Sequence, residues 1–282
     1  MISMYYALTK PGIVLGNIVT VTAGFILASK GVINIPLFLA TVLGIAFVMA
    51  SACVFNNYFD RHADQKMART KNRALPQGLI SLKSALTFAA LLGLCGIAVL
   101  FFYTNTLTAF IAFFGFFFYV VMYGIWKYKS VYGTLVGSVA GAVPPLVGYC
   151  AVSNRLDAGA IILFLIMVLW QMPHFYAIAM YRFDDYAAAS IPVLPVKKGM
   201  YVTKVHMLLY IIAFMIATWA LIAFGYVGYA YLVVATLAGA TWLILGFKGF
   251  SAKNDKIWAR QMFRVSLVVV MALSAMISFD WV

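Results

Sequence analysis

Residues 36–65 read PLFLATVLGIAFVMASACVFNNYFDRHADQ, an apolar run that ends with two carboxylates, Asp60 and Asp64. The apolar part, residues 36–57, has about the 20 residues that a helix needs to cross a bilayer. Acidic residues are rare in this chain, since its 282 residues include only seven, all of them Asp. Two of the seven stand where this helix leaves its hydrophobic surroundings, and this position predicts a polar function at the membrane edge.

The composition extends this interpretation to the whole chain. Hydrophobic residues make up 65% of the sequence and charged residues 10%, with a mean hydropathy of +1.00, whereas soluble domains carry roughly 25% charged residues. The sequence therefore predicts an all-α polytopic membrane protein. Nine spans are expected, at residues 12–29, 36–57, 83–103, 106–125, 133–151, 158–181, 204–224, 228–247 and 262–281.

Lysine and arginine lie almost entirely on one side of these spans. With the N terminus on the cytoplasmic side, every Lys and Arg except Lys30 and Arg155 falls in a cytoplasmic segment. This agrees with the excess of Lys and Arg that cytoplasmic loops of membrane proteins carry. Asp157 and Asp280 balance those two cations, so the formal charge of +13 lies on the cytoplasmic face. We expect a bacterial inner membrane protein surrounded by membrane lipid, with its N terminus cytoplasmic and its C terminus periplasmic.

Three other classes of function or feature are not expected. Nucleic-acid binding is disfavoured because the cations are spread over several loops and form no basic domain. Cys53, Cys95 and Cys150 lie within predicted spans and match no metal spacing, so they are interpreted as small apolar residues. The first apolar stretch is not interpreted as a cleaved secretory signal, because its removal would invert the charge bias downstream.

A weak internal repeat runs through the chain, which is expected to be a single domain over residues 1–282. A shift of 121 residues relates a four-helix unit at about 10–125 to a second at about 131–247, with a ninth helix left over. Chance matches among the many glycines are the alternative, and the sequence does not separate the two. The superposed pairs are Asp64 with Asp185, Gly78 with Gly199, Gly16 with Gly137, and Asp60 with Tyr181.

Asn56, Asp60 and Asp64 form a stack at the end of the second span. Their i, i+4, i+8 spacing places them on one helix face, about 6 Å apart along the axis. This is the C-terminal end of the helix, where the macrodipole disfavours anions. A divalent cation would remove that conflict, and a partial set of oxygen ligands suits Mg²⁺. The alternative is that both acids only pair with Arg61, Lys66 or loop arginines; we favour the metal site.

A second acidic pair, Asp184 and Asp185, follows the sixth span. Adjacent residues point about 100° apart on a helix, so at most one of them faces the first cluster. The repeat pairs Asp185 with Asp64, and we therefore assign Asp185 to the metal and catalytic site. Asp184 is expected to cap a helix or to meet a loop lysine.

Polar and cationic side chains that suit a diphosphate gather at the same membrane face. Arginine matches phosphate oxygens through paired N–H groups, and lysine supplies a point charge. Together with Asn56, the candidate diphosphate-binding residues are Lys10, Arg69, Arg73, Tyr123, Lys127, Lys197 and Lys198. Each could be a topology determinant alone, but their convergence favours a diphosphate site.

Four strings carry a resemblance that covers essentially the whole chain: NNYFDRHADQKMARTKNRALPQG, YGTLVGSVAGAVPPLVGYC, WQMPHFYAIAMYRFDDYAAASIPVLPVKKG and DKIWARQMF. They resemble the haem-farnesylating branch of the UbiA-type intramembrane prenyltransferases. The resemblance implies a nine-helix bundle with a central cavity that opens to the cytoplasmic side. It also implies Mg²⁺-dependent transfer of a farnesyl group from farnesyl diphosphate to a vinyl group of haem b, with water, giving haem O and diphosphate.

The resemblance also implies roles for individual residues. Asn56, Asp60 and Asp64 match the first aspartate-rich motif of the family, which binds Mg²⁺ and diphosphate. A tyrosine-lysine diphosphate motif is matched by Tyr123 and Lys127. The second aspartate-rich motif is incomplete, because Tyr181 stands at its first Asp and only Asp185 remains. One or two Mg²⁺ ions therefore remain open, and no role is assigned to Asp184 or Lys129.

Haem b as a substrate needs its own contacts. His174, beside Pro173, is the candidate haem contact, because neutral imidazole is a common haem ligand; a histidine that is merely hydrogen-bonded in the bundle is the alternative. The product is expected to pass to a haem-modifying enzyme or a terminal oxidase. Two rival functions stay open: prenyl transfer to an aromatic quinone precursor, and transport without catalysis. Tyr181 and the WQMPH string disfavour the first, and the position of the ionisable groups at one edge disfavours the second.

Overall fold

The computed structural model describes residues 2–282, and the regular secondary structure in this part is almost entirely helical. Nine helical stretches in this part are long and apolar enough to cross a membrane, which confirms the predicted number. They are formed by α2 (Pro11–Ser29), α3 (Ile35–Lys66), α4 (Leu82–Tyr103), α5 (Thr106–Phe117) continued through η1 (Phe118–Tyr123) and α6 (Gly124–Lys129), α7 (Gly133–Gly141) with α8 (Val143–Ser153), α9 (Ala158–Tyr181), α11 (Leu194–Ala223), α12 (Tyr229–Lys248) with η2 (Gly249–Ser251), and α13 (Asp255–Phe279). Two short helices, α1 (Ile2–Leu8) and α10 (Phe183–Ala188), complete the set.

Helix α3 explains why the two acids stand at a membrane edge. Asn34 caps its start by accepting a hydrogen bond from the backbone N–H of Leu37 at 3.1 Å, and the helix runs for 32 residues. At 1.5 Å per residue this is about 48 Å, whereas the hydrocarbon core is about 30 Å thick. Asn56 therefore lies about one bilayer thickness from the start of the helix, and Asp64 lies two turns beyond it.

Several spans depart from straight α-helix. The fourth contains a π-helical segment, η1, and the fifth breaks between α7 and α8, where Pro144 and Pro145 cannot donate backbone hydrogen bonds. Pro173 lies inside α9, which is continuous from Ala158 to Tyr181. The seventh span begins earlier than predicted: α11 starts at Leu194, and Gly199, with φ +82°, kinks it.

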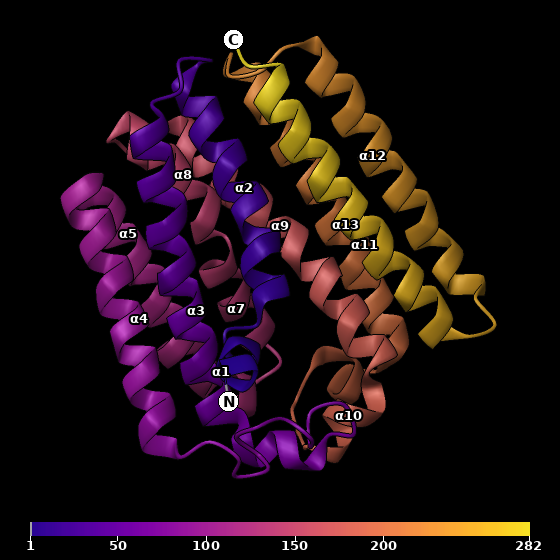
Figure 1. Cartoon of the computed structure of the whole chain (residues 1–282). Helices are drawn as coiled ribbons and strands as arrows, with labels where there is room; N and C mark the ends of the chain where they lie inside the picture. Colours follow the sequence, from indigo (N-terminus) through magenta and orange to yellow (C-terminus); the bar gives the residue numbers. More distant parts are fainter. Residues whose placement is uncertain (1) are drawn as a thin grey trace.

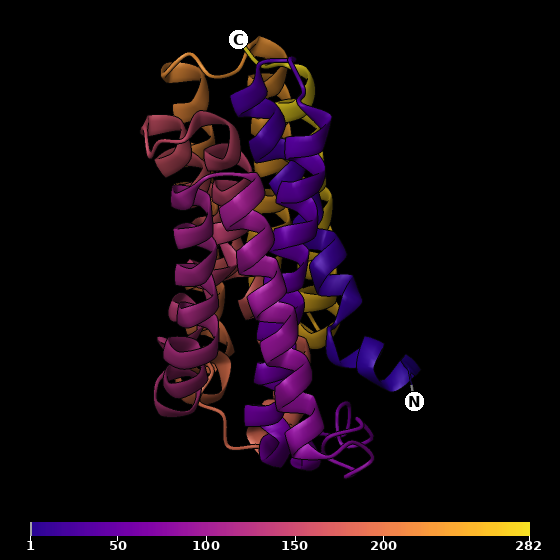
Figure 2. The same cartoon turned by 60° about the vertical axis from the view of Figure 1, so that its left-hand side comes forward.

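The helices pack as a single bundle whose two chain ends lie at opposite ends (Figure 1). The N terminus, α10 and the segment between α3 and α4 share one end, while the C terminus lies at the other, and the turned view agrees (Figure 2). This arrangement is what an odd number of spans produces. The four-helix repeat and the single-domain interpretation stay predictions.

Small residues allow α2 and α8 to cross at close range. A Cβ atom on Gly24 would lie 2.1 Å from the backbone oxygen of Pro145, and one on Gly148 would lie 2.1 Å from the oxygen of Val21. Neither distance is compatible with a side chain, so both glycines are required by the crossing. Close approach of small residues replaces the hydrophobic driving force that helices lack inside a membrane.

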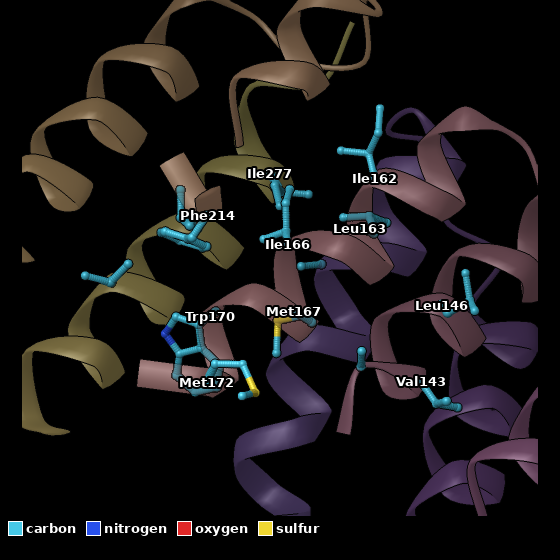
Figure 3. Packing of buried hydrophobic residues seen from close by; sticks show 14 of the residues in the cluster. Val143, Leu146, Ile162, Leu163, Ile166, Met167, Trp170, Met172, Phe214 and Ile277 are labelled. Carbon is cyan, nitrogen blue, oxygen red and sulfur yellow. The ribbon is translucent and has the colours of Figure 1, made fainter. Parts of the chain in front are cut away.

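The buried core is centred on α9. Figure 3 shows Trp170, Met167 and Ile166 of α9 beside Phe214 of α11 and Ile277 of α13. A small apolar cavity of about 20 Å³ lies among these helices, α2 and α8. The core therefore fixes α9 against α11 and α13, and this contact positions the acidic and aromatic residues farther along α9.

Candidate active site

The predicted stack at the end of α3 meets three of the predicted cations. Lys10 Nζ donates to Asn56 Oδ1 at 2.7 Å. Lys127 forms an ion pair with Asp60, and Arg73 Nη1 lies 2.9 Å from Asp64 Oδ2. Each member of the stack thus contacts one cation.

These three cations come from different parts of the chain. Lys10 lies between α1 and α2 with a left-handed backbone, φ +51°; Lys127 lies on α6, and Arg73 on the segment that joins α3 to α4. Burial from water lowers the pKa of Lys10, although the charge of Asp60 opposes the shift. Three separate elements therefore place positive charge along one face of α3.

Asn57, next to the stack, holds this arrangement together. Its side-chain amide donates to the backbone oxygen of Leu8 at 2.8 Å, at the end of α1. Its side-chain oxygen accepts from Arg73 Nη1 at 3.3 Å. One buried amide therefore ties α1 and the segment after α3 to the helix that carries the acids.

Tyrosines on the fourth span surround the Asp60 and Lys127 pair. Tyr128 donates its hydroxyl to Asp60 Oδ1 at 2.7 Å, and the ammonium group of Lys127 lies 5.1 Å from the ring centre of Tyr123. Tyr123 ends the π-helical segment η1 and stacks on Tyr119 with ring centres 5.5 Å apart. Single π-helical turns often occur at functional sites, and here the wider turn precedes the lysine.

The second acidic cluster lies on α10, which packs against the end of α3. Ala63 and Met67 form a small apolar cluster with Tyr186, Ala189 and Ile191. Burial raises the pKa of the Tyr186 hydroxyl, and Asp60 and Asp185 both add to the shift while Arg69 opposes it. Tyr186 therefore keeps its hydroxyl protonated where α10 packs against the end of α3.

Asp184 and Asp185 point to different partners, as their 100° separation predicts. Lys256 Nζ on α13 donates to Asp184 Oδ2 at 2.5 Å, so Asp184 meets a loop-side lysine as expected. Asp185 Oδ2 lies 3.9 Å from Arg182 Nη1. In the described part of the chain Asp185 does not join Asp60 and Asp64 in one three-carboxylate group.

Three predicted diphosphate-binding residues stand apart from these contacts. Arg69, Lys197 and Lys198 are exposed, and within residues 2–282 none of them forms an ion pair. The charge of Arg69 opposes the rise in the pKa of the Tyr186 hydroxyl. Their assignment stays a prediction.

The donor atoms on α3 fit a hard divalent cation. Within the described residues, Asp60 Oδ2 and Asp64 Oδ1 accept no hydrogen bond, while the other oxygen of each carboxylate is held by a cation. Two carboxylates and an amide oxygen cover only part of a coordination shell, which suits Mg²⁺ because that ion keeps water and substrate phosphate as its other ligands. The set does not suit a structural zinc site, which needs four nitrogen or sulfur ligands.

The alternative interpretation of the acids also finds support in these contacts. Asp64 pairs with a loop arginine, as that alternative predicts, whereas Asp60 pairs with Lys127 instead of Arg61 or Lys66. The ion pairs alone do not separate a structural role from a functional one.

His174 is buried on α9 and held by α13. Its Nδ1 lies 2.7 Å from the hydroxyl oxygen of Ser266, and its ring stacks on Trp170 with centres 4.6 Å apart. The Ser266 hydroxyl donates to the oxygen of Phe263 at 2.6 Å, so it accepts from Nδ1–H of the neutral imidazole. Nε2 then carries the lone pair, as a metal-ligating histidine requires, although a buried, hydrogen-bonded histidine has the same contacts.

Sequence reasoning missed three residues of this site: Asn57, Tyr128 and Tyr186. Each stands beside a predicted residue, Asn57 next to Asn56 and Tyr128 next to Lys127. This adjacency was the only indication of them in the sequence. Because adjacent side chains on a helix normally point in different directions, it argued against placing these residues in the site.

The chain is similar to proteins of known family. The model of the UbiA prenyltransferase family matches residues 17–268. Protoheme IX farnesyltransferase of Protochlamydia amoebophila (strain UWE25) is 56% identical over 282 residues, all of both chains, and that of Yersinia enterocolitica is 54% identical over all of this chain and 95% of its own. Among solved structures, a digeranylgeranylglyceryl phosphate synthase superposes with a TM-score of 0.81 at 19% identity, covering 99% of this chain and 98% of its own. A UbiA homolog from Archaeoglobus fulgidus bound to GPP and Mg²⁺ gives a TM-score of 0.69 at 17% identity, covering 98% and 99%.

Proposed function

The chain belongs to the UbiA prenyltransferase family, and on that premise we propose that it transfers a farnesyl group from farnesyl diphosphate to a vinyl group of haem b, with water, to give haem O and diphosphate. The family model spans most of the chain, and relatives named protoheme IX farnesyltransferase share more than half of its residues over the full length. These matches support the reaction and both substrates. Residues 1–282 act in this proposal as one catalytic unit.

One observation carries the assignment of the diphosphate site: each member of the Asn56, Asp60 and Asp64 stack contacts a cation from a different element. We assign the two carboxylates and the amide oxygen to one Mg²⁺ ion. Bound there, Mg²⁺ would neutralise charge on the leaving diphosphate. Asp185 remains a candidate for a second ion, because α10 packs on the end of α3.

The cations of the site have a second role in this proposal. Lys10, Arg73 and Lys127 exchange their oxygen partners on α3 for phosphate oxygens of the substrate, while Tyr123 lies beside Lys127. Their positive charge then stabilises the negative charge that develops as the allylic C–O bond breaks. Arg69, Lys197 and Lys198 are exposed at the same end and are assigned to the approach of the anionic substrate.

The apolar helices accept the rest of the substrates. We assign the farnesyl chain to the central cavity that the family resemblance implies, which is proposed to open at the cytoplasmic end, and we assign stabilisation of the allylic cation to aromatic rings on the helices. The haem vinyl group attacks that cation, water adds to the resulting haem-bound cation, and a proton leaves. His174 is assigned to the haem, since Ser266 fixes its neutral tautomer.

The multi-pass chain is proposed to lie in a bacterial inner membrane with its N terminus cytoplasmic and its C terminus periplasmic. The bias of Lys and Arg supports this orientation, because the cationic site lies at the N-terminal end of the bundle. A haem-modifying enzyme or a terminal oxidase is the proposed recipient of the product.

Purified chain, incubated with farnesyl diphosphate, Mg²⁺ and haem b, tests the proposal. Mass spectrometry should detect haem b that has gained one farnesyl group and one hydroxyl group. Reactions with 4-hydroxybenzoate, an aromatic precursor of quinones, serve as the comparison. Prenylated product from this acid but none from haem would overturn the haem assignment and leave the diphosphate site standing.

A further inference from the structure

A row of aromatic side chains runs between α9 and α13 toward the cationic end of the bundle. On α9, His174 and Tyr181 are seven residues apart, which places them on the same helix face about 10.5 Å apart along the axis. Phe263 of α13 lies between them, with its ring centre 4.9 Å from that of His174 and 5.8 Å from that of Tyr181. The row begins at Trp170, which lines the small apolar cavity and stacks on His174.

Two guanidinium groups end this row. The guanidinium of Arg182 lies 5.3 Å from the ring centre of Tyr181, and that of Arg260 lies 5.9 Å from the same ring. Tyr181 thus lies near positive charges from the junction of α9 with α10 and from α13. Aromatic faces attract cations, so the Tyr181 ring orients both arginines at the polar end of the aromatic row.

Arg260 differs from Arg182, the other arginine beside Tyr181, because no carboxylate pairs with it in the described residues. In the part of the chain that the structure describes, Asp185 is 3.9 Å from Arg182, Asp184 pairs with Lys256, and Asp255 pairs with Lys204. The Arg260 side chain is exposed and makes no ion pair among these residues. Its paired N–H donors remain open to an anionic ligand.

The arrangement as a whole matches the chemistry of haem. A porphyrin presents an iron that accepts imidazole, a flat apolar ring that packs on aromatic side chains, and two propionate carboxylates at one edge. His174, then Phe263 with Tyr181, then Arg260 present these three kinds of partner in the same order, from the interior to the polar end. A quinone precursor has neither an iron nor this separation between an apolar plane and its acid group.

We propose that Arg260 binds a propionate carboxylate of haem b and is a specificity-determining residue for the haem substrate. This inference rests on the proposed function. Arg182 is the less suited of the two arginines, because Asp185 already lies near it.

Haem binding without farnesyl diphosphate tests the inference directly. The full chain in detergent micelles is titrated with haem b, and the change in the haem absorption band gives the Kd. We expect Arg260→Gln to raise the Kd about tenfold or more, as loss of a charge-assisted hydrogen bond does, and Arg260→Lys to retain most of the affinity. Haem b dimethyl ester, which lacks the carboxylate charges, should bind the wild type and Arg260→Gln equally.

Arg264→Gln is the matched control. Arg264 is the same residue type on the same helix, is exposed, and has no ring contact to Tyr181 in the described residues. An equal loss for Arg264→Gln would point to a general positive field and overturn the assignment, as would an equal loss of dimethyl ester binding by Arg260→Gln. A weaker affinity for farnesyl diphosphate with unchanged haem binding would place Arg260 in the diphosphate site instead.

Failure of this inference is distinguishable from failure of the proposed function. If Arg260→Gln binds haem normally while the wild type still farnesylates haem, only the role of Arg260 is wrong. If the wild type gives no farnesylated haem, the proposed function itself is wrong.

Discussion

Single and double substitutions of the Asp60 and Lys127 ion pair distinguish a structural role of these residues from a functional one. The pair is well shielded, since the side chain of Lys127 is 8% exposed and that of Asp60 is 17% exposed. Removing one partner of a buried pair destabilises a protein by about 3–5 kcal/mol, because the other charge is left without compensation, whereas removing both is often nearly neutral. Asp60 is partly exposed and keeps the Tyr128 hydroxyl, so we expect the lower value, about 3 kcal/mol, for Asp60→Asn or Lys127→Met alone.

Stability and turnover should then respond differently in the double variant. Asp60→Asn/Lys127→Met should recover most of the lost stability, measured as the apparent Tm in detergent. Its kcat/KM for farnesyl diphosphate should not recover, because the proposed metal ligand and the proposed phosphate contact are both gone. Each single variant should lose about 100-fold or more in turnover, as loss of one preorganised charge contact does.

The Lys204 and Asp255 pair offers a matched control. It is also shielded, with Nζ and Oδ1 2.6 Å apart and side chains 9% and 29% exposed, and no site role is proposed for either residue. Its double variant, Asp255→Asn/Lys204→Met, should recover stability and turnover together. If Asp60→Asn/Lys127→Met likewise regains turnover to within a few-fold of the wild type, the pair is structural and the diphosphate site is wrong.

Further predictions concern the metal, the fold and the haem contact. Asp64→Ala should abolish turnover while the protein remains folded in the membrane, and a near-normal rate would remove the metal assignment. Chelation with EDTA should stop farnesyl transfer and added Mg²⁺ should restore it; full activity in EDTA would exclude metal dependence. Gly24→Ala should lower the apparent Tm, because its Cβ would lie 2.1 Å from a backbone oxygen of α8, whereas Gly16→Ala, with no atom within 4 Å, should not; equal effects would contradict the crossing argument. Ser266→Ala should raise the KM for haem with little change in the KM for farnesyl diphosphate, since it frees His174, and unchanged haem kinetics would remove His174 from the haem site.

The fold was largely predictable from local patterns. A membrane span needs only a sufficient length of apolar residues, and the distribution of Lys and Arg between the loops determines the direction in which each span crosses. The nine spans could therefore be placed without knowledge of any tertiary contact. One deviation was not predictable: residues 118–123 form a π-helical segment, although FYVVMY has the composition of any apolar helix. The start of α11 at Leu194 was missed although the sequence carries its signal, because proline, here Pro195, is tolerated in the first turn of a helix.

The alignment of Asn56, Asp60 and Asp64 on one face was likewise determined by the sequence, because i, i+4 spacing is a property of the helix itself. Which cation meets which acid was decided only by the tertiary structure. Lys10 is 46 residues from Asn56, and the serine that holds His174 is 92 residues away. Local sequence carries no information about such pairs, since they depend on how separate helices rotate and pack against one another. Hydropathy and charge thus determined where each helix crosses the membrane, and packing decided which polar groups face each other at its edge.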